Sequence, residues 1–160
     1  MLRGLLLGCA LFASHALADD FPKDLAPFSE FDWRSGFPEL GGHRPPVPQL
    51  GHNQATITQN GNDNRAVALQ FGGYNQLNAS QSGRANYAVL LQAGVRNSIS
   101  LVQVGDGNRA LIAQGGAFNA AQVAQNGLNN YVQILQMGFG LRVSVTQNGS
   151  NQVARVFQRN

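Results

Sequence analysis

From residue 53 onward, apolar and polar positions follow an eleven-residue unit that occurs ten times without an insertion, and each unit predicts one short β-strand. The third and fifth positions are apolar in every unit, whereas the positions between them vary. Alternation with a period of two is typical of a strand that buries one face. Glycine occupies the ninth position in nine units, where it can supply a positive φ for a turn. The pattern therefore predicts seven-residue strands, each followed by a turn over positions eight to eleven.

Two amide side chains mark fixed places in the unit. Asparagine opens eight of the ten units, and glutamine occupies the seventh position in all ten. All six prolines precede residue 49, so every amide of the predicted strands is free to join a hydrogen-bonded ladder. A strand this short cannot bury its apolar face alone, so two successive units are expected to pack face to face and to stack on the next pair.

The repeat thus predicts an all-β fold, a cross-β solenoid of five 22-residue strand-turn-strand rungs with two stacked parallel sheets. The rungs are 53–74, 75–96, 97–118, 119–140 and 141–160. Stacking places asparagine over asparagine and glutamine over glutamine, where their amides can hydrogen-bond along the stack. We refer to these side chains as the ladder residues: Asn53, Gln59, Asn64, Gln70, Asn75, Gln81, Asn86, Gln92, Asn97, Gln103, Asn108, Gln114, Asn119, Gln125, Asn130, Gln136, Gln147 and Gln158.

The end rungs of such a solenoid expose unpaired backbone groups and a fresh row of amides. The sequence gives no sign of a capping helix. An uncapped cross-β end is expected to template the addition of another chain, which indicates a self-assembling fibre subunit.

The first 52 residues differ in composition from the repeats. Residues 1–18 have the pattern of a secretory signal peptide, with Arg3, an apolar run and a small-residue cleavage site at Ala16–Ala18. Lipidation at Cys9 is the less favoured alternative. Residues 19–52 form a leader or linker rich in proline and aromatic residues, with six acidic and three basic side chains. It is expected to be poorly ordered alone, and its charge of −3 is opposite to the +5 of residues 53–160.

The two predicted sheets differ on their outer faces, at the fourth and sixth positions. The odd-numbered units carry mainly serine, threonine and amides there, whereas the even-numbered units carry residues such as Val67, Leu91 and Leu111. An apolar face of this size is expected to be covered. The candidates are the aromatic leader, a neighbouring fibril and the cell envelope.

The spacing Asn-x5-Gln-x4-Asn-x5-Gln, as in Asn53, Gln59, Asn64 and Gln70, resembles the curlin repeat of bacterial curli. The resemblance covers residues 53–160. It implies an extracellular functional amyloid, a cell-surface fibre (fimbrium) of the biofilm matrix that serves adhesion and aggregation. It also implies other curlin subunits as partners, an outer-membrane secretion channel with accessory proteins, and a role of the ladder residues in driving polymerisation.

Curli contain a major subunit and a minor, surface-associated nucleator. The last rung resembles the nucleator, because Leu141 and Gln152 replace asparagine, Asn160 replaces glycine, and the rung is basic. Its surface-attachment candidates are Arg142, Arg155 and Arg159. The segment 47–51 instead resembles the leader of the major subunit. We favour the minor, nucleating subunit, with the major subunit as the alternative.

An enzyme is not expected, and neither is a cofactor. The histidines lack metal-ligand spacing, and Asp63 and Asp106 fall in turns without a cleft between them. A third interpretation is a monomeric solenoid that binds a polyanionic matrix through a column of Arg65, Tyr87, Arg109 and Tyr131. No specific nucleic-acid partner is expected, because only 12% of the residues are charged.

Overall fold

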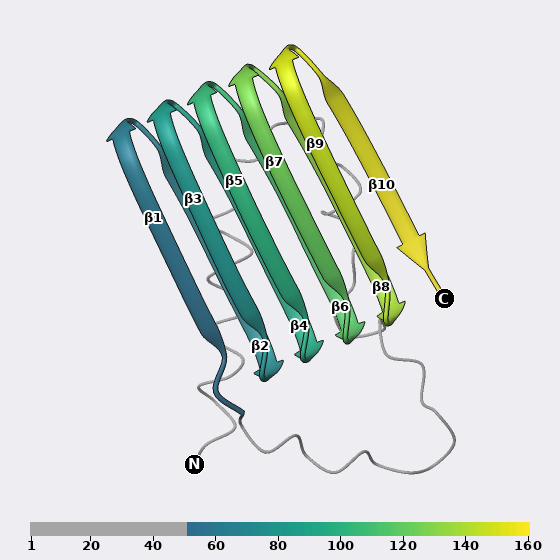
Figure 1. Cartoon of the computed structure of the whole chain (residues 1–160). Helices are drawn as coiled ribbons and strands as arrows, with labels where there is room; N and C mark the ends of the chain where they lie inside the picture. Colours follow the sequence, from purple (N-terminus) through teal and green to yellow (C-terminus); the bar gives the residue numbers. More distant parts are fainter. Residues whose placement is uncertain (1–50) are drawn as a thin grey trace, which may run out of the picture. The chain divides into compact units, whose positions relative to one another are not determined.

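The computed structural model describes residues 51–160, which fold into ten β-strands and no helix. The strands alternate between two five-stranded sheets, so that successive strands lie in opposite sheets (Figure 1). Sheet A consists of β1 (Gln54–Asn62), β3 (Gln76–Arg84), β5 (Ser98–Asp106), β7 (Ala120–Leu128) and β9 (Arg142–Ser150). Sheet B consists of β2 (Arg65–Gly73), β4 (Tyr87–Val95), β6 (Arg109–Ala117), β8 (Tyr131–Phe139) and β10 (Val153–Arg159).

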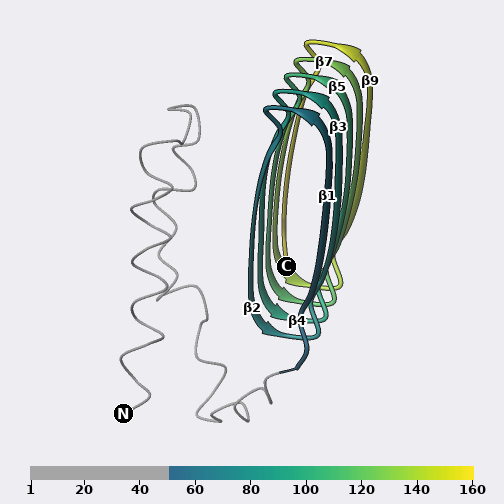
Figure 2. The same ribbon diagram turned by 90° about the vertical axis from the view of Figure 1, so that its left-hand side faces the viewer.

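All neighbouring strands are parallel and in register, with each residue paired to the residue 22 positions later. Gln54 pairs with Gln76 in sheet A, for example, and Gln70 pairs with Gln92 in sheet B. Viewed along the stack, each pair of strands forms one flattened rung (Figure 2). The predicted solenoid of five rungs and two parallel sheets is therefore confirmed.

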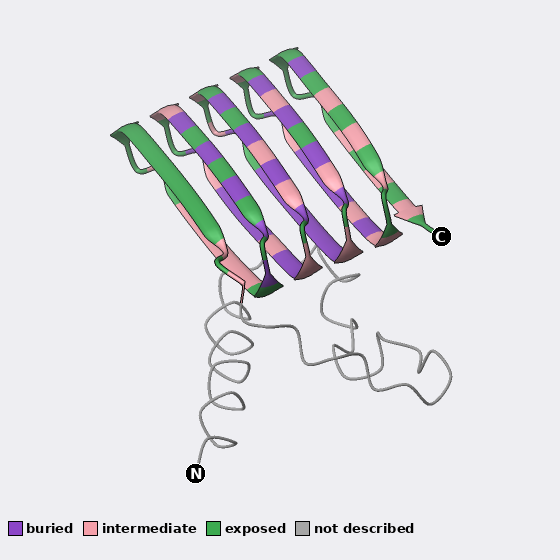
Figure 3. Ribbon diagram, turned by 60° about the horizontal axis from the view of Figure 1, so that its bottom comes forward, coloured by how far each residue is buried: buried purple, intermediate pink, exposed green. Residues whose placement is uncertain are grey.

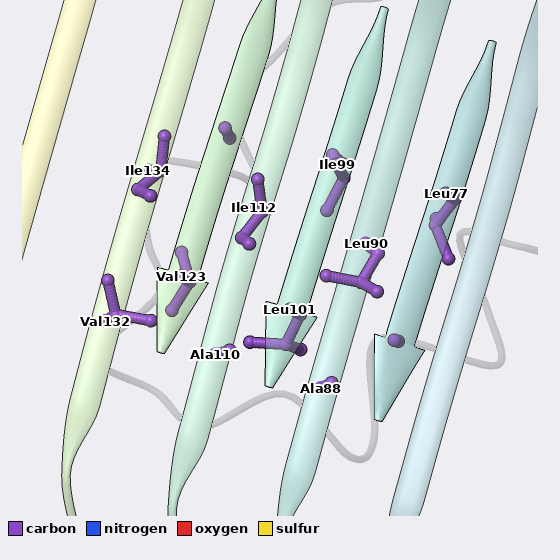
Figure 4. Close-up of a cluster of buried hydrophobic side chains, with 12 residues drawn as sticks. Leu77, Ala88, Leu90, Ile99, Leu101, Ala110, Ile112, Val123, Val132 and Ile134 are labelled. Atoms are coloured by element: carbon purple, nitrogen blue, oxygen red, sulfur yellow. The ribbon is translucent and has the colours of Figure 1, made fainter. Parts of the chain in front are cut away.

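The core lies between the two sheets and is built from the third and fifth positions of the repeat. Twelve of these side chains form one buried cluster (Figure 4). Both sheets contribute large and small side chains to it, as Leu77 and Ala79 do from sheet A and Ala88 and Leu90 from sheet B. The end strands are less covered, and Ile57 on β1 is 40% exposed. The predicted core positions are thus confirmed, with burial that falls off at the ends of the stack.

The strands are longer than predicted, and the turn lies elsewhere. Nine of the ten strands span nine residues, from the second to the tenth position of the unit. The prediction of seven-residue strands with a turn over positions eight to eleven was therefore wrong. The chain reverses instead around the eleventh and first positions, where residues such as Ala85, Arg96 and Phe118 have φ values of 56° to 59°. Their backbone N–H groups bond to the preceding rung, as Ala85 N donates to Asn62 O at 3.0 Å, which helps to hold this uncommon conformation.

The outer faces differ as predicted in composition and also differ in burial. On sheet A, Asn78, Ser80 and Gln122 are exposed and alternate with buried core residues (Figure 3). On sheet B, Val89 and Leu111 alternate with the core residues in the same way, yet they are buried. The leader that we expected to cover this face falls on residues outside the described part of the chain.

The predictions for residues 1–50, namely the signal peptide, the Cys9 alternative and most of the leader, also lie outside residues 51–160. In the part of the chain that the structure describes, no helix has the length and apolar character needed to cross a membrane.

Candidate functional site

The ladder residues form four columns that run the length of the stack. Each of the eight glutamines from Gln59 to Gln136 donates from Nε2 to Oε1 of the glutamine 22 residues later, at distances between 2.6 and 3.0 Å. A second Nε2 hydrogen bond crosses to the other sheet, as from Gln103 to the carbonyl of Tyr87 at 3.3 Å. The glutamines thus link each sheet along the stack and, from Gln70 onward, also tie the two sheets together. All the Nε2 groups point towards the later rung, so the column has a direction.

The asparagine columns hold the turns in the same repetitive way. Oδ1 of Asn97 accepts from the backbone N–H of Asn119 at 3.1 Å, and Nδ2 of Asn97 bonds to Asn75 Oδ1 at 3.1 Å. The same Nδ2 also donates to the carbonyls of Ala93 and Gly116, at 3.4 and 3.0 Å. The first carbonyl is near the end of β4 and the second is near the end of β6, the next strand of sheet B. Asparagine at the first position therefore closes the turn and joins it to the adjacent rungs.

These amides are buried, which makes their pairing energetically important. The inner ladder residues, from Asn75 to Gln136, are no more than 2% exposed. A buried amide group without a partner costs about 1–3 kcal/mol. The structure brings all the predicted ladder residues into the expected columns, so the pairing inferred from the repeat is present. Their role in polymerisation stays a prediction.

The glycines at the ninth position meet two requirements. Their φ values lie between 95° and 146°, as the repeat predicted for this position. In addition, a Cβ on most of them would overlap the carbonyl oxygen of the next rung's glycine. At Gly105, for example, this Cβ would lie 2.1 Å from Gly127 O. Gly149 on β9 differs, because its nearest neighbour would be Gln152 Nε2 at 3.5 Å. Only a rung stacked on β9 would bring a carbonyl oxygen into that place.

The two end rungs of the described stack are not equivalent. The first rung, β1 and β2, has the regular residues at every ladder position: Asn53, Gln59, Gly61, Asn64, Gln70 and Gly72. The last rung, β9 and β10, keeps Gln147, Gly149 and Gln158 but has Leu141, Gln152 and Asn160 at the other three. Leu141 N still donates to Asn119 Oδ1 at 3.0 Å, and Gln152 N to Asn130 Oδ1 at 3.0 Å. The last rung therefore satisfies the rung before it but presents different groups to whatever lies beyond.

The surface-attachment candidates lie on this last rung and are exposed. Arg142 is on β9, whereas Arg155 and Arg159 are on β10, so the three are divided between the two sheets. The guanidinium carbon of Arg155 lies 5.8 Å from the centre of the Tyr131 ring, within cation–π range. A role of these arginines in attachment stays a prediction.

A column of aromatic and cationic side chains on the turns after the even strands was missed by the sequence analysis. Arg96 lies between the rings of Tyr74 and Phe118, at 5.7 and 5.4 Å from their centres. The Phe118 ring is in turn 5.2 Å from that of Phe139. The signal was available for Tyr74, Arg96 and Phe118, which occupy the eleventh position of the even units and are 22 residues apart, whereas Phe139 is at the tenth position, at the end of β8.

The residues considered for other activities occupy structural positions. Asp106 Oδ1 accepts from Arg84 N at 2.9 Å, and Asp63 lies in a turn with a φ of 59°. No group of three histidine, cysteine or acidic side chains that could hold a metal ion occurs within residues 51–160. The proposed polyanion column is aligned in sheet B, where Arg65, Tyr87, Arg109 and Tyr131 pair in register.

Comparison with known proteins gives one family. The model of the curlin associated repeat matches residues 52–83 and 94–127. No curated protein and no solved structure matches the chain. The two matched segments lie within the part of the chain where the ladder residues are regular, and they stop before the last rung.

Proposed function

The chain belongs to the curlin family of repeat proteins, and on that premise we propose that it is a structural subunit of extracellular amyloid (curli) fibres. It assembles with copies of itself and with other curlin subunits by adding rungs to an existing stack. The proposed role is structural rather than enzymatic, because the conserved spacing within the repeat serves hydrogen-bond columns and not a reactive centre.

The observation that carries this proposal is that, within residues 51–160, hydrogen bonding along the stack stops at the end rungs without being completed. Successive residues of a strand direct their N–H groups to opposite sides. Gln54 N bonds to Asn75 O on the inner side of β1, so Ile57 N points away from β3. On β9, Ala120 N bonds to Leu141 O from the inner side, and Ser144 N points outward. Unpaired strand edges of this kind are templates for another chain.

The side-chain columns extend the same argument. Gln147 Nε2 donates to the carbonyl of Tyr131 at 3.0 Å, and beyond β9 the described chain offers it no further glutamine. At the other end, Gln59 is exposed, and no glutamine among residues 51–160 donates to its Oε1 in the way that Gln59 donates to Gln81 Oε1. A donor at one end and an acceptor at the other make the two ends complementary.

Within the fibre, we assign the chain to the minor, nucleating subunit in preference to the major subunit that forms the fibre body. The support is the irregular, arginine-rich last rung, which differs from the regular rungs before it. Export through an outer-membrane channel, contact with a polyanionic matrix and a place on the bacterial surface in the biofilm follow from the same assignment.

The test is polymerisation of the full chain after rapid removal of denaturant, followed by amyloid-dye fluorescence. The expected result is dye-positive fibres, and fragments of these fibres are expected to abolish the lag of a separate curlin major subunit. A chain that stays monomeric and silent to the dye, alone and with the major subunit, would overturn the proposal. Polymerisation without any effect on the major subunit would overturn the nucleator assignment and leave the fibre subunit.

A further inference from the structure

We propose that the two ends of the stack are unequal docking surfaces. The first rung fits a neighbouring curlin-repeat chain whose own last rung carries asparagine at both opening positions. The last rung of this chain, in contrast, is a weakened acceptor that disfavours a second copy of the same chain. This inference rests on the proposed fibre function and adds to it a direction and a preferred partner.

The inner rungs define what a regular junction contains. Across each one, the backbone N–H of the later asparagine donates to Oδ1 of the earlier asparagine, and across the first two junctions its Nδ2 group does so as well. Asn75 makes these two contacts to Asn53 at 3.0 and 3.2 Å, and Asn86 makes them to Asn64 at 3.1 and 3.0 Å. The earlier Oδ1 is therefore the acceptor that fixes the start of the next strand.

A second copy stacked on the last rung would not find this acceptor in sheet A. By the 22-residue register, its Asn53 would lie over Leu141. The leucine side chain has no oxygen, so the backbone N–H of Asn53 would lack its acceptor, whereas Nδ2 would lack one acceptor and keep its bond to Gly72 O at 3.2 Å. Enclosing a donor without a partner costs more than the absence of one hydrogen bond, because the group also loses its water.

The sheet B side of the same junction departs from the pattern twice. Asn64 of the second copy would lie over Gln152, whose side chain is one methylene longer and donates from Nε2 to Asn148 O at 3.1 Å. Gly72 of that copy would lie over Asn160, which stands at a ninth position where the other nine units have glycine. The Asn160 side chain is already engaged, since its Oδ1 accepts from Phe139 N at 2.8 Å and its Nδ2 donates to Phe139 O at 2.9 Å.

The junction is weakened rather than blocked, because the glutamine columns remain continuous. Gln147 and Gln158 of one copy would meet Gln59 and Gln70 of the next in the usual direction. Gly149 also leaves space for the incoming backbone. The first rung has none of the three departures, so all of the mismatch comes from the last rung. A chain whose last rung is regular would therefore dock on the first rung with complete columns.

The test compares the natural chain with a repaired chain that carries Leu141→Asn, Gln152→Asn and Asn160→Gly. Both are allowed to polymerise to equilibrium, and the concentration of monomer that remains is measured. The repaired chain is expected to leave a monomer concentration about tenfold lower than the natural chain does. A tenfold change corresponds to the net contribution of a little over one hydrogen bond. Circular dichroism of each variant checks that the strands are retained.

A single junction can be isolated with one proline on each end. Ile57→Pro removes an outward N–H from the first rung, and Ser144→Pro removes one from the last rung, where an edge strand tolerates proline. Neither substitution breaks a hydrogen bond within the chain. The Ile57→Pro copy can then dock only through its last rung and the Ser144→Pro copy only through its first, so a mixture stops at a dimer. Its dissociation constant is measured by analytical ultracentrifugation.

The inference predicts that adding the three repairing substitutions to the Ile57→Pro copy lowers the dissociation constant about tenfold. The same substitutions in the Ser144→Pro copy serve as the matched control, because its last rung is already blocked, and are expected to change nothing. Equal constants with and without repair, together with equal residual monomer concentrations, would overturn the inference while leaving the fibre function intact. If neither the natural nor the repaired chain forms fibres or dimers, the inference and the fibre function both fail.

Discussion

Replacing Gln103 by leucine tests whether the buried glutamine column stabilises the fold. Gln103 lies at the centre of its column in sheet A and is 0% exposed. Its Oε1 accepts from Gln81 Nε2 at 2.7 Å, and its Nε2 donates to Gln125 Oε1 at 2.8 Å. The substitution keeps a side chain of similar length but removes both contacts, together with the longer bond from Nε2 to Tyr87 O at 3.3 Å. It leaves one N–H of Gln81 and the Oε1 of Gln125 without these partners.

The expected loss follows from these two groups. At about 1–3 kcal/mol for each buried polar group left unsatisfied, Gln103→Leu is expected to lower the free energy of unfolding by about 4 kcal/mol. This is a large share of the stability of an ordinary domain, which is about 5–15 kcal/mol. Leucine recovers part of the loss through its apolar surface, but it cannot satisfy its two neighbours.

The assay is guanidinium denaturation of freshly prepared monomer, followed by far-ultraviolet circular dichroism. Gln122→Leu is the matched control, because Gln122 lies in the same sheet but is exposed and outside the columns. Gln59→Leu is an intermediate case, since Gln59 is exposed and bonds to Gln81 alone. The control is expected to change stability by less than about 0.5 kcal/mol. If Gln103→Leu were as mild as the control, the energetic argument for the columns would be refuted.

Three further predictions concern other positions. Gly105→Ala is expected to lower the free energy of unfolding, measured by denaturation, by about 4 kcal/mol through backbone strain and overlap with Gly127 O. Gly149→Ala is expected to lower it by only about 1–2 kcal/mol, through strain alone. Equal losses would contradict the close approach at Gly105. Leu101→Ala is expected to lower the free energy of unfolding by about 3 kcal/mol and Ile57→Ala by less than about 1 kcal/mol, because Leu101 is 1% exposed and Ile57 is 40% exposed. If Ile57→Ala lowered the midpoint of thermal unfolding more than Leu101→Ala does, the placement of the core would be refuted. Arg96→Ala is expected to lower the free energy of unfolding by about 0.5–1 kcal/mol because it removes the contacts with two rings, and Arg96→Lys is expected to lower it less. If denaturation showed no loss for Arg96→Ala, the aromatic column would not be a source of stability.

The parts of the fold that depend on contacts between equivalent positions could be predicted from the sequence. Asparagine, glutamine and glycine recur because each meets its own kind in the neighbouring rung, and such a contact constrains the residue type in every unit. The third and fifth positions are likewise apolar in all units because they share one core. These regularities were sufficient to predict the solenoid, its register and the ladder columns.

The eleventh position could not be predicted for the opposite reason. It is occupied by residues as different as Asp63, Ala85 and Phe118, all with a positive φ. Aspartate, asparagine or glycine, which favour a positive φ, occupies five of the nine eleventh positions with this conformation, whereas Tyr74, Ala85, Arg96 and Phe118 occupy the others, where hydrogen bonds of the turn hold it. The ends of the strands were also mispredicted, because backbone pairing between rungs continues past the ninth-position glycine to the tenth position of each unit.

The measurement that tests the central claim most directly is solid-state nuclear magnetic resonance of fibres grown from an equal mixture of ¹⁵N-labelled and ¹³C-labelled chains. Only contacts between different molecules give signals in such a sample. Rung-on-rung stacking predicts a contact between Gln147 Nε2 of one molecule and the Gln59 side-chain amide of another, with the hydrogen-bond geometry of the inner column, where donor and acceptor lie 2.6–2.8 Å apart. Fibres in which this contact is absent, and in which the intermolecular signals come only from the outer faces of the sheets, would contradict the account.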